Sequence, residues 1–295
     1  MRVIDIDPKL LQKEAEAAVH AADESWIHME AEYVGKIPEL METLVPEGPY
    51  AYTILPQVLP DGTIKMPILS TREEIREAYK FVRGRSDLLS TEAIVEIRGT
   101  WYTFTEAVSR GRVKGQDSIG TTHLVSMFPV SGGKGITGEL VWPLVPRANL
   151  GRGPVKEVTN ALALRRHVLA QHDAYLKALR GSDVEGILET MNEDVMGAVR
   201  DYVNDTGTLI SLDGKAAHRA YYQSLFKRYD VVSVDVLDRL VQEWYTFAEL
   251  RFTMRCRDGA GGTLAFNTAE FFVPGNDDRI ILRIGHGTDP ASAES

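Results

Sequence analysis

The sequence predicts an α+β protein built from two copies of one small domain in tandem. Its 295 residues are about twice a typical domain length. The string WYTFTE at Trp101–Glu106 recurs as WYTFAE at Trp244–Glu249, an offset of 244 − 101 = 143 residues. Helical periodicity comes first in the second half and period-two alternation follows, which is the order typical of helices packed against a sheet.

Other matches at nearly the same spacing support duplication. Glu42-Thr43-Leu44 matches Glu189-Thr190-Met191 at an offset of 189 − 42 = 147. Ala78-Tyr79 matches Ala220-Tyr221 at an offset of 220 − 78 = 142. Loop insertions account for a drift of a few residues, whereas chance does not account for repeated matches in the same order.

A stretch rich in proline and glycine lies between the two copies. Proline blocks helix continuation and glycine loosens the backbone, so this stretch is predicted to be a linker. The polar residues at the carboxyl end predict a disordered tail. The predicted division is a first domain over 1–145, a linker over 146–159, a second domain over 160–288 and a tail over 289–295.

The second copy shows its elements clearly. Apolar residues at helical spacing predict three helices, the second opening at Ser182 with a capping-box pattern. Alternating residues then predict a meander of strands, which would curl around the helices and leave a ligand cavity at its open end. The predicted helices are His167–Leu179, one beginning at Ser182 and Lys215–Tyr229; the predicted strands lie near Val232–Val236, Trp244–Arg255, Leu264–Val273 and Arg279–His286.

Composition limits the classes of partner. A net charge of −9 and a pI of about 5.4 argue against nucleic acid and against an anionic membrane surface. The single cysteine, Cys256, allows no intrachain disulfide, and no run of apolar residues is long enough to span a membrane. The amino-terminal residues lack the pattern of a signal peptide. A cytoplasmic location is therefore expected.

The second half resembles the nuclear-transport-factor-2-like (SnoaL-like) superfamily. The resemblance is carried by the helical segment DAYLKALRGSDVEGILETMNEDV, a further helix, and strands ending AEFFVPGNDDRIILRIGHG. It implies a cone of helices on a curved, mainly antiparallel sheet, repeated in both copies. The superfamily includes ketosteroid isomerase, dehydratases, an epoxide hydrolase, polyketide cyclases, formaldehyde-eliminating lyases and non-catalytic binding proteins, so the resemblance predicts the fold better than the reaction.

Laid on ketosteroid isomerase, the second copy keeps one of three chemical groups. Tyr175 takes the place of the oxyanion-hole tyrosine, while the two aspartate positions fall on Val199 and Ala269. Steroid isomerisation in this copy is thus disfavoured, because that chemistry needs both carboxyl groups.

The positions of the first copy that align with Tyr175, Val199 and Ala269 are His28, Tyr52 and Val125. His123 lies two residues before Val125 and so on the same face of the strand. The resemblance then implies a site like that of the dehydratases, which use histidine and tyrosine without a cofactor. The structural alternative is that His28 lies on a helix surface and that His123 only hydrogen-bonds across the sheet.

These positions give a set of candidate site residues. Histidine exchanges protons near neutral pH and tyrosine polarises oxygen atoms, while tryptophan would stack on an aromatic substrate. No metal or cofactor motif accompanies them. The predicted catalytic residues are His28, Tyr52 and His123; the predicted substrate-binding residues are Tyr50, Trp101, Trp142, Tyr175, Asn267 and His286.

Two functions from different classes follow. The first is a cofactor-independent acid–base enzyme acting on a small apolar or aromatic molecule, with a dehydrating or formaldehyde-releasing lyase as the leading hypothesis and an isomerase or cyclase as its alternative. The second is a non-catalytic pseudo-dimer that binds a ligand or partner. Sheet faces of this kind would also allow homo-oligomers to form.

Overall fold

The computed structural model describes residues 7–54, 57–58, 64–144, 160–204, 206–257, 262–275 and 277–293. Contacts divide the chain into two compact units, residues 1–55 with 69–144, and residues 56–68 with 145–295. The predicted linker over 146–159 lies outside the described residues. Among the described helices, none is both long and apolar enough to cross a bilayer.

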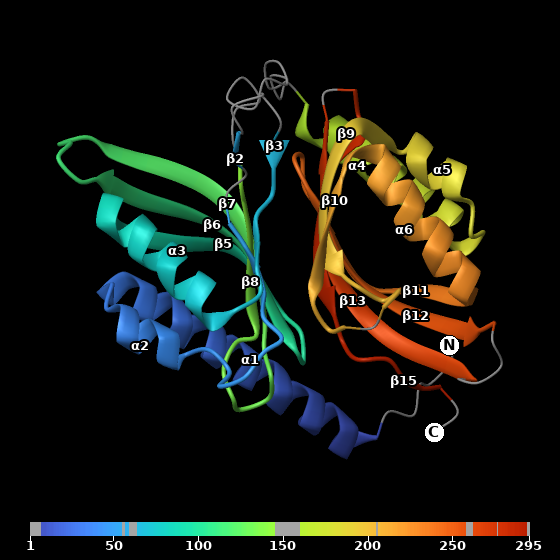
Figure 1. The fold of residues 1–295 in the computed structure, drawn as a ribbon, viewed down its shortest axis with the longest axis horizontal. Helices are drawn as coiled ribbons and strands as arrows, with labels where there is room; N and C mark the ends of the chain where they lie inside the picture. Colours follow the sequence, from blue (N-terminus) through green and yellow to red (C-terminus); the bar gives the residue numbers. More distant parts are fainter. Residues whose placement is uncertain are drawn as a thin grey trace. The chain divides into compact units, whose positions relative to one another are not determined.

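The first unit packs three helices on one face of a six-stranded sheet (Figure 1). The sheet is antiparallel except where β1 and β8 run parallel. Between β1 and β4 along the chain, β2 (Gln57–Val58) and β3 (Ile64–Lys65) form a separate two-stranded sheet, whose residues group with the second unit. The helices are α1 (Pro8–Val34), α2 (Ile37–Glu42) and α3 (Arg72–Arg85); the sheet runs β4 (Ile68–Leu69), β1 (Ala51–Thr53), β8 (Gly138–Pro143), β7 (Ile119–Pro129), β6 (Tyr102–Val113), β5 (Ser86–Arg98).

The second unit repeats this arrangement (Figure 1). Its three helices again cover one face of the sheet, and a short strand, β15 (Ala291–Ser292), pairs with β13. The helices are α4 (Ala161–Arg180), α5 (Val184–Glu189) and α6 (Gly214–Arg228); the sheet runs β10 (Leu209–Asp213), β9 (Met191–Arg200), β14 (Ile280–Gly287), β13 (Thr263–Pro274), β12 (Thr246–Cys256), β11 (Tyr229–Val241).

Element order and sheet order agree position by position, so the prediction of two tandem α+β domains is confirmed. Local hydrogen bonds agree as well: the hydroxyl groups of Thr43 and Thr190 each donate to the carbonyl three residues earlier, at 2.7 and 2.6 Å. The repeated hexapeptide closes a hairpin in each copy, where the carbonyls of Tyr102 and Tyr245 accept bonds from the backbone amides of Gly99 and Gln242.

Two strands of the second copy, β9 and β10, were not predicted. β9 lies between β10 and β14 and pairs parallel with the latter. Its residues from Val195 to Arg200 are buried on both faces of the sheet. A strand buried on both faces lacks the alternation on which strand prediction depends.

Two further details correct the predictions. Asp183 rather than Ser182 caps α5, because its carboxylate accepts the amide hydrogen of Gly186 while Ser182 has a positive φ of 50°. The segment predicted as a disordered tail contains β15, so its described part is ordered by pairing with β13.

Candidate active site

The first unit contains a cavity of about 270 Å³ between its helices and the concave face of its sheet. Charged groups, hydroxyl groups and aliphatic side chains share its lining, and among the described residues Phe128 is the one aromatic side chain in it. The remaining lining residues are Met29, Glu32, Val82, Arg83, Ser86, Asp87, Leu88, Thr91, Ala107, Ser109, Gly111, Thr122, Leu124, Ser126, Glu139, Val141 and Pro143.

Two carboxyl groups and one guanidinium group meet in this cavity. Glu32 comes from α1, Glu139 from β8 and Arg83 from α3, and their side chains are only 19%, 16% and 14% exposed. The Arg83 Nη2 lies 3.8 Å from the Glu32 Oε1, while the Nε of Arg83 is buried without a hydrogen-bond partner among the described residues. A buried donor without a partner is uncommon in folded proteins and marks this guanidinium group for attention.

Glu32 holds its proton more tightly than an ordinary glutamate. Burial, and next the negative charge of Glu139, raise the pKa of its carboxyl to about 8, against the opposing effect of Arg83. At neutral pH Glu32 is therefore mostly a neutral acid, and a carboxyl group with a pKa near the working pH can transfer a proton in either direction.

A chain of hydrogen bonds runs from the helices to Glu139. The Nδ1 of His28 lies 2.6 Å from the Thr43 hydroxyl, and its Nε2 lies 3.0 Å from the Tyr79 hydroxyl. The Tyr79 hydroxyl in turn lies 2.6 Å from the Glu139 Oε2. His28 is fully buried, and Tyr79 and Glu139 connect it to the cavity.

The proton positions in this chain follow from counting donors. Thr43 donates its one hydroxyl hydrogen to the carbonyl of Leu40, so the Nδ1 of His28 must donate to Thr43. If Tyr79 donates to Glu139, His28 must also carry hydrogen on Nε2 and is a cation beside an ionised Glu139. If Tyr79 donates to His28, the imidazole is neutral and Glu139 carries the proton. Both arrangements satisfy every contact, so the chain can move one proton between His28 and Glu139.

Tyr52 lies beneath the same cavity. Its hydroxyl is buried and makes no hydrogen bond of normal length and angle with another described residue. Burial raises its pKa well above the usual value, and the charge of Glu139 adds to this effect, while a nearby Tyr79 hydroxyl partly opposes it. Tyr52 is thus a neutral phenol next to Glu139.

His28, Glu32 and Glu139 could also act as metal ligands, because one ligand atom from each lies within 4.8 Å of the others. The Tyr79 hydroxyl, however, bonds to both His28 and Glu139 and occupies the space between them. A metal ion would have to displace it, so the arrangement fits a hydrogen-bonded proton chain better than a metal centre.

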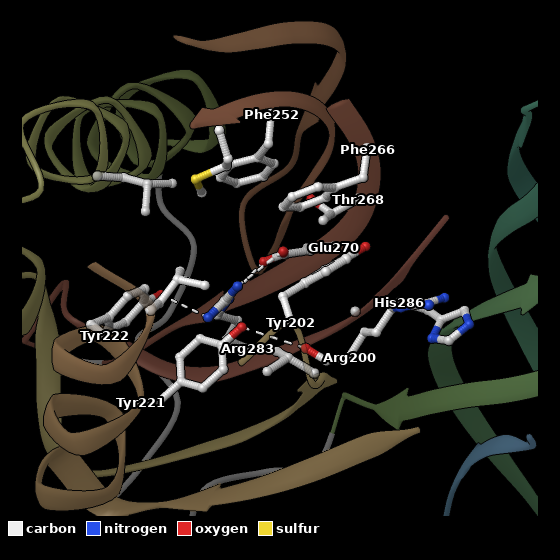
Figure 2. A pocket seen from close by; sticks show the side chains of 15 residues that line it. Arg200, Tyr202, Tyr221, Tyr222, Phe252, Phe266, Thr268, Glu270, Arg283 and His286 are labelled. Atoms are coloured by element: carbon white, nitrogen blue, oxygen red, sulfur yellow. Dashed lines mark hydrogen bonds and ion pairs between the residues drawn. The ribbon is translucent and has the colours of Figure 1, made fainter. Parts of the chain in front are cut away.

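The second unit carries a corresponding chain with different chemistry, of which Figure 2 shows Tyr222, Arg283 and Glu270. The hydroxyl groups of Tyr175 and Tyr222 lie 2.8 Å apart, and Arg283 donates to Tyr222 at 2.7 Å. Arg283 also forms a two-bond ion pair with Glu270, at 2.6 and 3.0 Å. The places of His28, Tyr79 and Glu139 are therefore taken by Tyr175, Tyr222 and Arg283. The sequence suggested Tyr221 as the counterpart of Tyr79, and the structure shows that Tyr222 is the counterpart.

The cavity of the second unit is nearly closed, with a volume of about 20 Å³. Phe252 and Phe266 pair across β12 and β13 and fill it (Figure 2). At the corresponding pair of the first unit, across β6 and β7, stand Ser109 and Thr122. Small side chains keep the first cavity open, and large ones fill the second.

The structure does not bring His123 into the cavity. Its neighbours Leu124 and Ser126 alternate into the lining, whereas His123 points to the opposite face, where its Nε2 lies 2.7 Å from the Glu106 Oε1. The structural alternative for His123, a hydrogen bond across the sheet, is confirmed. His28 is likewise neither on a helix surface nor in the cavity lining but behind it.

The predicted aromatic residues do not line the first cavity either. Trp142 lies on β8 between Val141 and Pro143, which do line it, and faces away. Tyr50 is a core residue whose hydroxyl donates to the carbonyl of Val45 at 2.8 Å. Trp101 packs edge-to-face on Tyr102 at a hairpin end, with ring centroids 4.9 Å apart. Stacking of an aromatic substrate on these residues is therefore not supported.

In the second unit the predicted residues separate. Asn267 lies on the face opposite Phe266 and Thr268, and its amide donates to Glu249 at 3.1 Å, the counterpart of the bond between His123 and Glu106. His286 borders the small closed space, and Tyr175 reaches that space only through Tyr222. The prediction that all three face one cavity is wrong for Asn267 because strand parity was assigned one residue off.

Sequence reasoning missed Glu32, Arg83 and Glu139. Glu32 follows His28 by four residues and so lies on the same face of α1, which was an available signal. The strand register also corrects the alignment of the two copies. Tyr52 pairs with Glu139, and Gly197 pairs with Arg283, so the counterpart of Tyr52 is Gly197 rather than Val199. The meeting of residues from α1, α3 and β8 depends on tertiary packing, which the sequence does not display.

Comparison with known proteins finds a family match within the second copy. The family described as SnoaL-like domain matches residues 172–282. No curated protein sequence matches the chain significantly.

Solved structures resemble one copy of the chain at low identity. An LEH-like epoxide hydrolase from Mycobacterium tuberculosis is 13% identical, with 42% of this chain and 84% of that one covered and a TM-score of 0.35. A ketosteroid isomerase-like protein from Erwinia carotovora atroseptica is 14% identical, with 42% and 96% covered and a TM-score of 0.34. The epoxide hydrolase/cyclase-like enzyme of pyran ring formation in the polyether salinomycin is 16% identical, with 44% and 96% covered and a TM-score of 0.36.

Proposed function

Because residues 172–282 form a SnoaL-like domain whose topology the first copy repeats, we propose that the protein is an acid–base enzyme that works in the cavity of its first copy. The observation that carries this proposal is the pair Glu32 and Glu139, two carboxyl groups in one cavity of which Glu32 keeps its proton near neutral pH. Two carboxyl groups in opposite protonation states are the arrangement that general acid–base chemistry requires.

The reaction that suits these groups is elimination of water from a β-hydroxy carbonyl compound. Glu139, in the arrangement in which Tyr79 donates its hydrogen bond to it, removes the proton on the carbon next to the carbonyl. Glu32 gives its proton to the departing hydroxyl group, which leaves as water while the carbon–carbon double bond forms. The Arg83 Nε, which is buried without a partner, would stabilise the negative charge that develops on the carbonyl oxygen.

The two carboxyl groups also restore each other. After one turnover Glu139 holds a proton and Glu32 has lost one, and their oxygen atoms lie within 4.8 Å. A proton returned across this gap, directly or through water, regenerates the starting state without a co-reactant. Because acid and base act from the same side of the substrate, the elimination would be syn.

The second copy would then serve as scaffold. Its counterpart of Glu139 is Arg283, held by Glu270, and its cavity is nearly closed. An arginine stays protonated at every accessible pH, so the group that stands in the place of Glu139 does not exchange protons near neutral pH.

The test is a panel of β-hydroxy ketones in D₂O, followed by NMR for vinyl protons and for deuterium next to the carbonyl. We expect turnover by the wild type and a loss of about 100-fold or more in Glu32→Gln and Glu139→Gln, the usual contribution of a general acid or base. Glu106→Gln is the matched control, since Glu106 pairs with His123 on the other face of the sheet. Full activity in both cavity variants, or an equal loss in the control, would overturn the proposal.

A further inference from the structure

The first cavity carries a row of hydroxyl groups that crosses three neighbouring strands. Thr91 on β5 pairs with Ser109 on β6, and Ser109 pairs with Thr122 on β7. All three line the cavity, and the hydroxyl oxygens of Thr91 and Ser109 lie 3.0 Å apart. Each hydroxyl group can both donate and accept a hydrogen bond.

The same row in the second copy is entirely apolar. Val234 pairs with Phe252, and Phe252 pairs with Phe266, at the corresponding register positions. All three side chains are buried in the core of the second unit. Three apolar residues in the closed copy thus stand where the open copy has three hydroxyl groups, so the polarity of this wall differs as a unit between the copies.

From this row we infer the class of ligand, an uncharged aliphatic molecule that bears hydroxyl or ether oxygens. The inference rests on the proposed function only in using the same cavity. The oxygens would bond to Thr91, Ser109 and Thr122, and the carbon frame would lie on aliphatic lining residues such as Leu124 and Val141.

Two further properties of the lining restrict the ligand. Anions are disfavoured, because Arg83, the one cationic lining side chain among the described residues, already lies beside Glu32, and Asp87 and Glu139 add carboxyl groups to the wall. Flat aromatic molecules are disfavoured, because the described part of the lining holds a single aromatic residue, Phe128, and an aromatic face would leave the hydroxyl row without partners. The volume of about 270 Å³ exceeds the roughly 150 Å³ of a cavity that holds benzene, so a substituted six-membered ring fits.

The experiment compares three probes by saturation-transfer NMR titration: 1,3-cyclohexanedimethanol, m-xylene and cyclohexane-1,3-dicarboxylate. We expect the diol to bind about tenfold or more tightly than either of the others, the difference that the hydrogen bonds of two hydroxyl groups can supply. Equal binding of m-xylene, tighter binding of the dicarboxylate, or no measurable binding of the diol would overturn the inference.

Variants of the row make the test specific. Thr91→Val, Ser109→Ala and Thr122→Val together remove the hydroxyl groups and keep the cavity, so the diol should weaken about tenfold while m-xylene should not. An unchanged Kd for the diol would contradict the inference.

A second variant refills the cavity with the residues of the other copy. Ser109→Phe with Thr122→Phe should abolish binding of every probe, and Thr121→Phe, one residue away on the opposite face, should leave it intact. If circular dichroism shows that the refilled variant does not fold, the hydroxyl-free variant decides alone. Binding that survives in a folded refilled variant would contradict the assigned site.

Glu32→Gln separates the two proposals. Retained diol binding with lost turnover agrees with both. Turnover that survives in Glu32→Gln while the diol binds as expected would contradict only the catalytic roles. Failure of the diol while Glu32→Gln loses turnover would contradict only the ligand class.

Discussion

The titration of Glu32 has a consequence for stability that can be measured without a substrate. A carboxyl whose pKa is raised in the folded state binds its proton more tightly there than in the unfolded chain. Its contribution to stability is therefore complete below pH 4.5, the ordinary value, and is lost as the pH rises through about 8.

Glu32→Gln should accordingly stabilise the protein at pH 9, by roughly 1–3 kcal/mol, and change little at pH 5. Urea unfolding at the two pH values measures this. Glu139→Gln should lower the pKa of Glu32 by removing the neighbouring negative charge, so it provides an internal check. A stability difference that does not depend on pH would mean that Glu32 is ionised throughout.

The ion pair between Arg283 and Glu270 gives a second prediction at the scale of single residues. The two side chains are 6% and 3% exposed, so removing one partner leaves a buried charge without compensation. Arg283→Met should destabilise the second unit by about 3–5 kcal/mol, whereas Arg283→Met with Glu270→Leu should recover most of that loss. Chemical denaturation of both variants tests this, and equal stability of the single and double variants would contradict it.

Among elements, the two equivalent helices α3 and α6 begin differently. Thr71 caps α3 with a complete capping box, in which its hydroxyl accepts from the amide of Glu74 and the Glu74 carboxylate accepts from the amide of Thr71. Asp213 precedes α6 without a side-chain capping bond.

Thr71→Ala should therefore destabilise the protein by about 1 kcal/mol, and Asp213→Ala should have a much smaller effect. Thermal unfolding of the two single variants gives the comparison. Because α3 carries Tyr79, a frayed α3 should also weaken its hydrogen bond to Glu139. An equal loss in both variants would mean that the hydroxyl of Thr71 contributes nothing specific.

The same scale explains what the sequence could and could not predict. The helical stripes of α4 to α6 and the alternating strands β11 to β14 are local patterns, and their prediction is confirmed. β9 has no such pattern because both its faces are buried. For the site, His28 and Tyr52 were selected near the cavity, but the decisive contact of Glu32 with Glu139 joins residues 107 positions apart (139 − 32) and has no local signal.

At the scale of the whole molecule, the two copies keep the same order of helices and strands, while residues at corresponding positions differ in size and chemistry. Where the first copy has Tyr52 and Ile75, the second has Gly197 and His218. A side chain at Gly197 would come within 2.9 Å of the His218 Nε2, so the large residue has moved from the strand to the helix. The exchange replaces the apolar side chain of Ile75 by the buried imidazole of His218.

This divergence places three buried histidines of lowered basicity in the second unit. Burial lowers the pKa of His172 and His218 to about 4, and burial together with the charge of Arg200 lowers that of His286 to about 3. A histidine with a depressed pKa in the folded state stabilises the fold above 6.5, its ordinary value. That contribution is lost as the pH falls from 6.5 toward 4, because the unfolded chain takes up protons that the folded chain excludes.

Acid should therefore weaken the second unit first. Each of the three histidines should cost roughly 1–2 kcal/mol of stability at pH 5 relative to pH 7, so that residues 160–293 lose protection from amide hydrogen exchange before residues 7–54 and 64–144 do. His218→Ile, which restores the residue of the first copy, should reduce this loss by the share of one histidine. Exchange measured by mass spectrometry and corrected for the intrinsic rate distinguishes the units. If both units lose protection together, or if His218→Ile is as acid-sensitive as the wild type, the acid response originates elsewhere than in these buried imidazoles.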